Sequence, residues 1–228
     1  MNTQHTLLLR LIGPMQSWGH RSRFDDRDTA LEPTRSGVIG LLCAAMGIPR
    51  EQDLSRFDSL RMGVRVDAPG RVMTDYHTAL DVIKADGSGR DTVQSRRHFL
   101  TDARFTAGLE SNDLELLREI EAKLGDPVWP LYLGRKSFPL TEPPLLPGGS
   151  ILDNKTLEDA LREAPWWRMW RYEREPQEPV RALLEDSEGK IAQTDWPLHF
   201  GERRFSLRRM TTVWISTPIP VEDLPCCI

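Results

Sequence analysis

The sequence predicts an α+β fold, because two segments with helical periodicity alternate with runs that have the composition of β-strands. The order is strand, helix, strand, strand, helix, strand, which is typical of a ferredoxin-like (RRM-like) antiparallel sheet with two helices. A pair of long strand-like arms around a polar tip adds a projecting β-hairpin. Short strands after residue 137 predict a reduced C-terminal β lobe. Many unrelated enzymes share the ferredoxin-like arrangement, so it does not identify a function.

The first strand and the first helix open the predicted sheet. Residues 6–12 include four leucines that occupy both faces, which indicates a central strand. The next helix begins after Pro33, where the Thr34 side chain can accept hydrogen bonds from free amides of the first turn. It runs through Met46 and ends at Gly47, a residue type that favours the helix C-terminus.

Two glycines inside this helix require an explanation. Gly37 and Gly40 each cost about 1 kcal/mol relative to alanine in a helix interior. They make sense if another group packs very close to the helix. We expect either a neighbouring strand or a phosphate bound at the helix N-terminus beside Arg35 and Ser36.

Residues 49–133 complete the expected order of elements. The helix over 112–124 has the clearest periodicity, with a capping box of Asn112 and Glu115 and an end at Gly125. The hairpin arms exceed the usual strand length of about 5–6 residues, so we expect the hairpin to project from the body. The elements of this part are a short polar helix over 49–60, a strand over 60–68, arms over 72–83 and 92–109, the helix over 112–124 and a strand over 128–133.

The chain divides into two expected parts. Residues 1–137 form the ferredoxin-like domain with the hairpin at about 72–109, and residues 138–228 form a connector and the small C-terminal lobe. Trp166, Trp167 and Trp170 belong to the core, to a partner interface or to a base-stacking platform. The expected elements are a connector over 138–150, a helix over 156–164, a hairpin of 180–184 and 190–194, and a last strand over 204–216.

Composition limits the function classes. The chain has 228 residues, of which 39% are hydrophobic, so it can bury a substantial core. Its formal net charge of −4 argues against a protein that coats nucleic acid non-specifically, although a local basic groove remains compatible. No apolar run approaches the roughly 20 residues of a membrane span, so we expect a cytoplasmic protein. The three cysteines and five histidines have no disulfide or metal-ligand spacing, so we expect no cofactor and no metal.

A turn after the strand over 128–133 is the first candidate phosphate site. Gly134, Arg135, Lys136 and Ser137 combine adjacent cations with a glycine that lets the backbone approach a ligand. The turn lacks the two-glycine spacing of a P-loop. The alternative is a solvated turn without a ligand.

The turn after the first strand is the second candidate. A base could stack on Trp18 while Gln16 reads its edge and Ser17 adds a hydroxyl, which is how single-stranded RNA is commonly held. Burial of Trp18 against the sheet is an equal alternative. Arg23 and Arg35 are among the arginines near this edge, but nearby aspartates offset them, which leaves much of the loop open to self-pairing.

The returning arm of the hairpin supplies a third group of cations. Arg96, Arg97, His98 and Arg104 all lie on it. Strict alternation places Arg96, His98 and Arg104 on one face and Arg97 on the other. One of these faces could line an RNA, and the alternative is that the arginines are simply solvated.

Three motifs together resemble the CasD family. They are the run 13–19 (Gly-Pro-Met-Gln-Ser-Trp-Gly), the run 34–42 at the start of the first helix, and the run 132–137 (Tyr-Leu-Gly-Arg-Lys-Ser). The resemblance covers the chain from end to end.

The resemblance implies a non-catalytic subunit of the type I-E CRISPR surveillance complex Cascade that caps the 5′ handle of the guide RNA, with CasC and CasA as partners. The hairpin would be the thumb that inserts where the guide RNA bends, and the C-terminal lobe would be the degenerate half of the family fold. The expected RNA-binding residues are Gln16, Ser17, Trp18, Arg23, Arg35, Ser36, Arg96, Arg97, His98, Arg104, Gly134, Arg135 and Lys136.

Two other functions stay open. Tyr76, His77, His98 and Lys136 could serve a metal-independent endoribonuclease that processes CRISPR repeat RNA, because attack by a 2′-hydroxyl needs little more than a base and an acid. Tyr76 and His77 are adjacent on a strand, however, and so face opposite ways. In Cascade the resemblance implies that a separate subunit, CasE, cuts the RNA. The third possibility is a protein-assembly module whose basic residues only decorate the surface.

Overall fold

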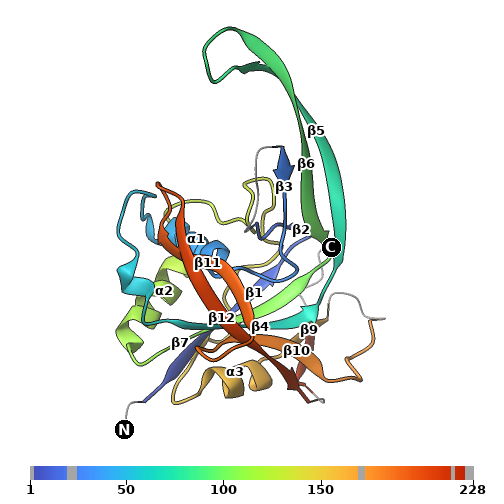
Figure 1. Ribbon diagram of the computed structural model, residues 1–228. Coiled ribbons are helices and arrows are strands. Elements are labelled where there is room, and N and C mark those ends of the chain that lie inside the picture. The colour runs from blue at the N-terminus through green and yellow to red at the C-terminus, as the bar shows by residue number, and fades with distance from the viewer. Residues whose placement is uncertain (1–2, 20–24, 169–172, 217–218, 224–228) are drawn as a thin grey trace.

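The computed structural model describes residues 3–19, 25–168, 173–216 and 219–223 (Figure 1). Its main body is a seven-stranded sheet of order β11-β12-β10-β4-β7-β1-β8, and every neighbouring pair is antiparallel. The fold is α+β, as the sequence predicted. The strands of this sheet are β1 (His5–Ile12), β4 (Arg61–Ala68), β7 (Arg104–Ser111), β8 (Ile151–Leu152), β10 (Val180–Glu185), β11 (Ile191–His199) and β12 (Arg204–Ile215).

Helices cover both faces of this sheet. Helices α1 (Arg35–Met46) and α2 (Leu114–Gly125) pack on one face over a large apolar core, whereas α3 (Leu157–Glu163) packs on the other (Figure 1). Strand β1 shows why, since Leu7 and Leu9 enter the first core and Leu8 enters the second. The prediction that β1 is apolar on both faces is confirmed. Among the described residues, no helix combines the length and the apolar character needed to cross a membrane.

Helix α1 has the expected ends. The Thr34 Oγ1 accepts a hydrogen bond from the Gly37 amide at 3.2 Å, and Gly47 ends the helix in the left-handed conformation with a φ of +69°. Helix α2 differs by one residue at its start, because Asp113 and not Asn112 is the cap. The Asp113 carboxylate accepts a hydrogen bond from the Leu116 amide at 3.0 Å.

The strand predicted over residues 128–133 was wrong. The Val128 amide donates to the carbonyl of Ala45, and the Trp129 amide donates to the carbonyl of Ala44, so this segment completes the end of α1. Strand β8 takes the place beside β1 instead. The polar helix predicted over 49–60 is also wrong, since a single turn of 3₁₀ helix, η1 (Ser55–Phe57), is what forms there.

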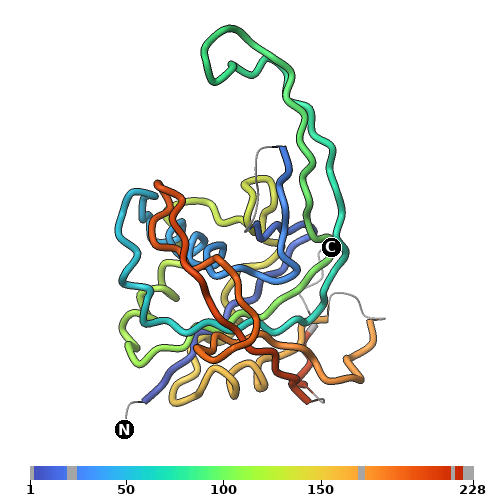
Figure 2. Tube along the Cα trace, in the orientation of Figure 1, coloured from blue at the N-terminus to red at the C-terminus, as the bar shows by residue number. Residues whose placement is uncertain are grey.

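A long hairpin projects from the body (Figures 1 and 2). It consists of β5 (Arg71–Ile83) and β6 (Arg90–Thr101), and most of its side chains are exposed. The predicted returning arm over 92–109 is in fact two strands, because Asp102 adopts a φ of +54° and breaks β6 from β7. Two short strands, β2 (Met15–Gln16) and β3 (Asp26–Arg27), pair with β6 at the base of the hairpin.

The C-terminal strands continue the main sheet, because β10 pairs with β4. Trp166 and Trp167 lie on strand β9 (Trp166–Arg168), which pairs with β13 (Val221–Asp223). Both indoles are at most 4% exposed, so the structure supports the core interpretation for these two residues. Trp170 lies outside the described residues.

Candidate nucleic-acid interface

The base of the hairpin brings three segments together. Strand β3 runs parallel to β6, and its register places Arg27 beside Arg97. The main-chain amide of Arg96 donates to the carbonyl of Asp25 at 2.8 Å and holds this pairing. Arg97 is half-buried and Arg27 is exposed, so a ligand can reach both side chains.

Arg135 ties the third segment to these strands. Its Nη2 donates to the carbonyl of His98 at 2.8 Å and to the carbonyl of Arg27 at 3.3 Å. Burial lowers the pKa of the Arg135 guanidinium, and the neighbouring charges of Arg97 and Arg27 lower it further, whereas Asp75 and Asp28 act in the opposite sense. We call Arg27, Arg97 and Arg135 the cationic cluster. A bound anion would relieve the repulsion among these three charges.

Gly134 is required where the turn meets the strand edge. Its φ is +89°, and a Cβ at this position would lie 1.7 Å from the carbonyl oxygen of Ser17. The contact is reinforced by a hydrogen bond from the Ser17 amide to the carbonyl of Leu133 at 3.0 Å. Phe138 then packs on Phe99 of β6, with 5.7 Å between ring centroids. The turn is therefore held in place before any ligand binds.

The opposite face of β6 carries Arg96 and His98. The His98 Nε2 lies 3.1 Å from an Asp26 oxygen, and its Nδ1 lies 2.9 Å from the Thr74 hydroxyl. Arg96 is exposed opposite Tyr76. The alternation expected along this arm therefore separates Arg97 from Arg96 and His98, and the cationic cluster lies on the Arg97 side.

The expectation for Gln16 and Trp18 needs correction. The Trp18 indole is 1% exposed, and its Nε1 donates to the Gln16 side-chain oxygen at 3.1 Å. The Gln16 side-chain nitrogen donates to the carbonyls of Leu11 and Ala103 at 3.0 and 2.7 Å. No face of either group is left for a base. The equal alternative, burial of Trp18, is what the structure shows.

The segment that buries Trp18 also determines the surroundings of Ser17 and Gly37. The Ser17 hydroxyl is buried and donates to the carbonyl of His98 at 3.3 Å. A Cβ on Gly37 would lie 2.6 Å from Trp18 Cε3, so the close neighbour of helix α1 is the indole. At Gly40 the nearest atom to a Cβ would be Phe200 Cζ at 3.9 Å, which is ordinary contact.

Arg35 is a core residue and does not face a phosphate. It is 1% exposed, and its Nη1 lies 2.9 Å from both carboxylate oxygens of Glu185. The guanidinium also stacks on Trp196 at 3.7 Å from the ring centroid. The main-chain amide of Arg35 donates to Asp195 at 2.8 Å, so a carboxylate of the chain itself occupies the helix N-terminus. Ser36, half-buried, donates to the Thr34 hydroxyl at 3.4 Å.

Arg104 is also placed differently from the expectation. The break at Asp102 puts it on β7, so the alternation that joined it to Arg96 and His98 does not reach it. Its side chain is 4% exposed, pairs with Glu173 and lies 5.2 Å from the Trp166 ring centroid. Arg104 therefore supports the core.

The structure thus brings together four of the residues predicted to bind RNA. Gly134, Arg135, exposed Lys136 and Arg97 gather at the base of the hairpin. Arg27 belongs with them but is not among the residues expected to bind RNA. Only the pairing of β3 with β6 reveals its place, and a strand of two residues leaves no pattern in a sequence. Arg23 lies outside the described residues.

The residues considered for catalysis do not converge. Tyr76 and His77 face opposite sides of β5, and His98 is held between Asp26 and Thr74. Among the described residues, no group of three or more potential ligand side chains is arranged to hold a metal ion.

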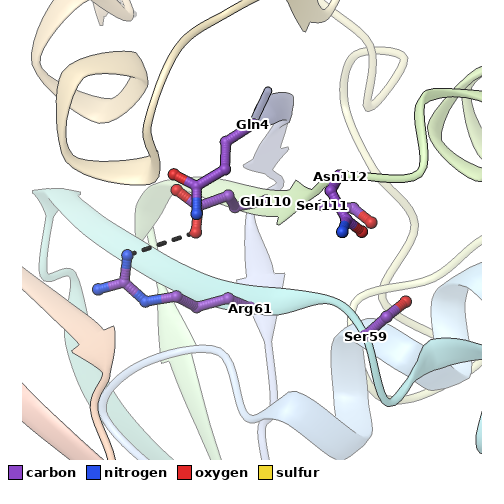
Figure 3. A pocket seen from close by; sticks show the side chains of 6 residues that line it. All are labelled: Gln4, Ser59, Arg61, Glu110, Ser111 and Asn112. Atoms are coloured by element: carbon purple, nitrogen blue, oxygen red, sulfur yellow. Dashed lines mark ion pairs between the residues drawn. The ribbon is translucent and has the colours of Figure 1, made fainter. Parts of the chain in front are cut away.

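A polar pocket of about 330 Å³ lies where β4 begins and β7 ends, at the ends of these two strands that are remote from the hairpin (Figure 3). The one cation among the described residues of its lining is Arg61. The Arg61 guanidinium already binds both oxygens of Glu158 and the carbonyl of Glu185 and lies 3.5 Å from Glu110. The hydrogen bond to Glu158 raises the pKa of Arg61. Since its donors are engaged, the pocket is a weaker candidate than the cationic cluster. Its lining consists of Gln4, Ser59, Arg61, Glu110, Ser111 and Asn112.

Comparisons with known proteins agree on one group. The family profile described as CRISPR-associated protein (Cas_Cas5) matches residues 6–215. The CRISPR system Cascade subunit CasD of Escherichia coli (strain K12) is 39% identical over 153 residues, which cover 60% of this chain and 68% of CasD. A crystal structure of a Cas protein superposes with a TM-score of 0.77 at 41% identity, covering 95% of this chain and 98% of the other. A chain of a CRISPR RNA-guided surveillance complex superposes with a TM-score of 0.75 at 35% identity, covering 92% and 90%.

The fold and its close superposition on these structures define a CRISPR-associated protein. More specifically, the chain belongs to the CRISPR-associated protein (Cas_Cas5) family. The resemblance to CasD, inferred from three sequence motifs, is confirmed.

Proposed function

We propose that this protein is a non-catalytic, RNA-binding subunit of a Cascade-type CRISPR surveillance complex, in which it caps the 5′ handle of the guide RNA in antiviral defence. Membership of the Cas_Cas5 family and the similarity to CasD and to a chain of an RNA-guided surveillance complex support this role. The observation that carries it is the cationic cluster, in which Arg135 hydrogen-bonds the main chains of two strands beside Arg27 and Arg97.

The cluster suits a phosphate backbone. Arginine presents planar, bidentate donors that match phosphate oxygens, and a half-buried position makes each contact stronger than one in open water. Of the Arg135 nitrogens, only Nη2 donates to main-chain carbonyls of the described residues, so the others can donate to a ligand. Lys136 is exposed next to it and adds a further charge. Flanking bases would then lie along the hairpin.

We infer that the central strands form a ferredoxin-like unit. The order β8-β1-β7-β4, with α1 after β1 and α2 after β7, corresponds to the 4-1-3-2 order of that arrangement. Residues 1–137 would hold most of this unit, with the hairpin as the thumb, and residues 138–228 would supply the fourth strand and the reduced lobe. The partners would be CasC and CasA, and the compartment would be the cytoplasm.

Binding without turnover is favoured over the endoribonuclease alternative. Two of the groups considered for acid–base catalysis, Tyr76 and His77, lie on opposite faces of β5, and the imidazole of His98 is already bonded on both nitrogens. A general base and a general acid must instead converge on one phosphate.

The test is to incubate the purified full chain, in chelator, with end-labelled repeat RNA and to run native and denaturing gels. We expect a shifted band and intact RNA. Site-specific products that disappear with His98→Ala would instead establish the endoribonuclease. Full complex assembly without any RNA contact from this chain would establish a protein-assembly module.

A further inference from the structure

Strand β5 has an open edge. It pairs with β6 along its length, and no other strand of the described residues pairs with it. The Arg96 amide donates to Asp25, so it points away from β5. Tyr76 lies directly opposite Arg96. Two opposite residues of an antiparallel pair point their N–H and C=O groups either both toward the partner strand or both away from it. The N–H and C=O of Tyr76 therefore point away from β6.

The same direction holds for every second residue. Val72, Thr74, Tyr76 and Thr78 therefore present a row of free N–H and C=O groups along the outer edge of β5. The side chains beside this row are exposed and partly apolar on both faces of the ribbon. Val72 is 51% and Tyr76 is 59% exposed on one face, and Met73 is 49% exposed on the other.

Strand β11, at one edge of the main sheet, has features that prevent it from pairing with a strand of another chain. Strand β11 contains Pro197 and two register shifts, which interrupt pairing with another chain. The part of β5 from Arg71 to Ala79 contains no proline and no lysine and pairs without a register shift. It is a long edge that lacks proline and register shifts, with Arg71 and Asp75 as its charged side chains, and a two-stranded ribbon is only marginally stable by itself.

We propose that the outer edge of β5 accepts an extended strand from a companion protein subunit, so that the hairpin becomes a sheet of at least three strands. An extended polypeptide satisfies alternating donors and acceptors at the strand repeat, which a phosphate backbone cannot do. Its alternating side chains would cover the apolar groups on both faces. The incoming strand should be rich in β-branched and aromatic residues, as suits exposed Val72, Met73 and Tyr76.

A second copy of this chain fits the edge less well. Arg97 belongs to the cationic cluster and lies on β6 opposite Asp75, the residue between Thr74 and Tyr76 of the open row. Two copies paired through β5 would bring two cationic clusters toward each other, and like charges oppose that arrangement.

This inference rests on the proposed role as a subunit of an assembly, but strand addition and RNA binding can be separated. Thr78→Pro removes one outward N–H, and Thr78→Ala removes the same side chain but keeps the N–H. Each variant is co-expressed with the companion subunits CasC and CasA and guide RNA, and the complex is purified. We expect Thr78→Pro to reduce recovery of this chain in the complex at least about tenfold, while Thr78→Ala matches the unchanged protein. RNA binding by both isolated variants should be unchanged. If the wild-type chain itself does not bind RNA, this result counts against the proposed function and not against strand addition.

Hydrogen exchange of the unchanged protein gives an answer that needs no variant. The amides of residues 72, 74, 76 and 78 should exchange at least about tenfold more slowly in the complex than in the free chain. Equal exchange in both states overturns the proposal. Slowing by guide RNA alone assigns the edge to RNA, and slowing that rises with the concentration of the free chain assigns it to a second copy, so either result also overturns it.

Discussion

The Nη2 of Arg135 lies 2.8 Å from the carbonyl oxygen of His98, and this hydrogen bond fixes the turn after Leu133 against strand β6. The Arg135 guanidinium also lies 5.4 Å from the ring centroid of Phe138 and is close enough to Arg97 to feel its charge. Burial and the charge of Arg97 both lower the pKa of Arg135, so the site favours an anion before one arrives.

Gly134→Ala should displace the turn. A Cβ there would overlap the Ser17 carbonyl, and the φ of +89° is strained for alanine. We expect the free energy of unfolding in urea to fall by about 3 kcal/mol, from overpacking and backbone strain together. Gly87→Ala is the control, since Gly87 has a φ of +72° in open space. Its cost should stay at about 1 kcal/mol, and equal costs for both variants would show that the Ser17 contact is unimportant.

Two glycines of helix α1 should respond with opposite signs. Gly37→Ala forces a methyl group against the Trp18 indole, so the free energy of unfolding should fall by about 1–3 kcal/mol. Gly40→Ala has ordinary space beside Phe200 and gains helix propensity, so it should stabilise the protein by up to about 1 kcal/mol. Thermal unfolding of both variants is the measurement. Stabilisation by Gly37→Ala would mean that the indole is not packed there.

Arg35→Ala should destabilise the protein and not act through RNA contact. It removes the nearer of the two arginines that pair with the buried Glu185 carboxylate and leaves only Arg208 at 3.5 Å, which should cost about 3 kcal/mol. Arg56→Ala breaks an exposed ion pair with Glu119 and should cost less than about 1 kcal/mol. Urea unfolding distinguishes the two. If Arg35→Ala keeps full stability but loses RNA, Arg35 is a ligand contact after all.

Cys43 should be unreactive in the folded protein. Burial raises the pKa of its thiol to about 12, because the thiolate loses its hydration in the core. The folded state therefore holds this proton more tightly than the unfolded chain, and stability from this group is lost as the pH rises above the unfolded pKa of about 8.5. In a Cys226→Ser, Cys227→Ser variant, a thiol reagent at pH 8 should label Cys43 only in denaturant. Rapid labelling of the native protein would contradict the burial.

Some of the regular elements were predictable from local pattern, but the hairpin expected from 180–184 and 190–194 was wrong, because β10 and β11 each pair with β12 and not with each other. Helix α1 is fixed by Thr34 and Gly47, and strand β1 by its leucines. The fourth strand of the sheet was not predictable, because β8 is only two residues long and residues 128–133 are diverted to the end of α1. The break between β6 and β7 depends on Asp102 in a left-handed conformation, which composition does not reveal. The division of the chain at residue 137 stays a prediction.

The candidate site was partly predictable for the same reason. The glycine and cations of residues 134–136 are adjacent in the sequence, so their chemistry is visible there. Whether Trp18 stacks on a base or packs on Gly37, and whether Arg35 faces a phosphate or Glu185, depends on contacts between distant segments. Periodicity cannot distinguish these outcomes. The RNA contacts of Arg97, Arg135 and Lys136 remain predictions.

The most direct test of the central claim uses two adjacent arginines that face opposite ways. Arg97→Ala, within the cationic cluster, and Arg96→Ala, on the other face of β6, remove the same charge from the same strand. The affinity of the full chain for guide RNA is measured for each variant over a range of salt concentrations. Arg97→Ala should remove one phosphate contact. This loss should weaken binding about tenfold or more and should reduce the slope of log K against the logarithm of the salt concentration by about 0.7. Arg96→Ala should change both much less. Equal losses for the two variants, or a loss confined to Arg96→Ala, would contradict the assignment of RNA binding to the cationic cluster.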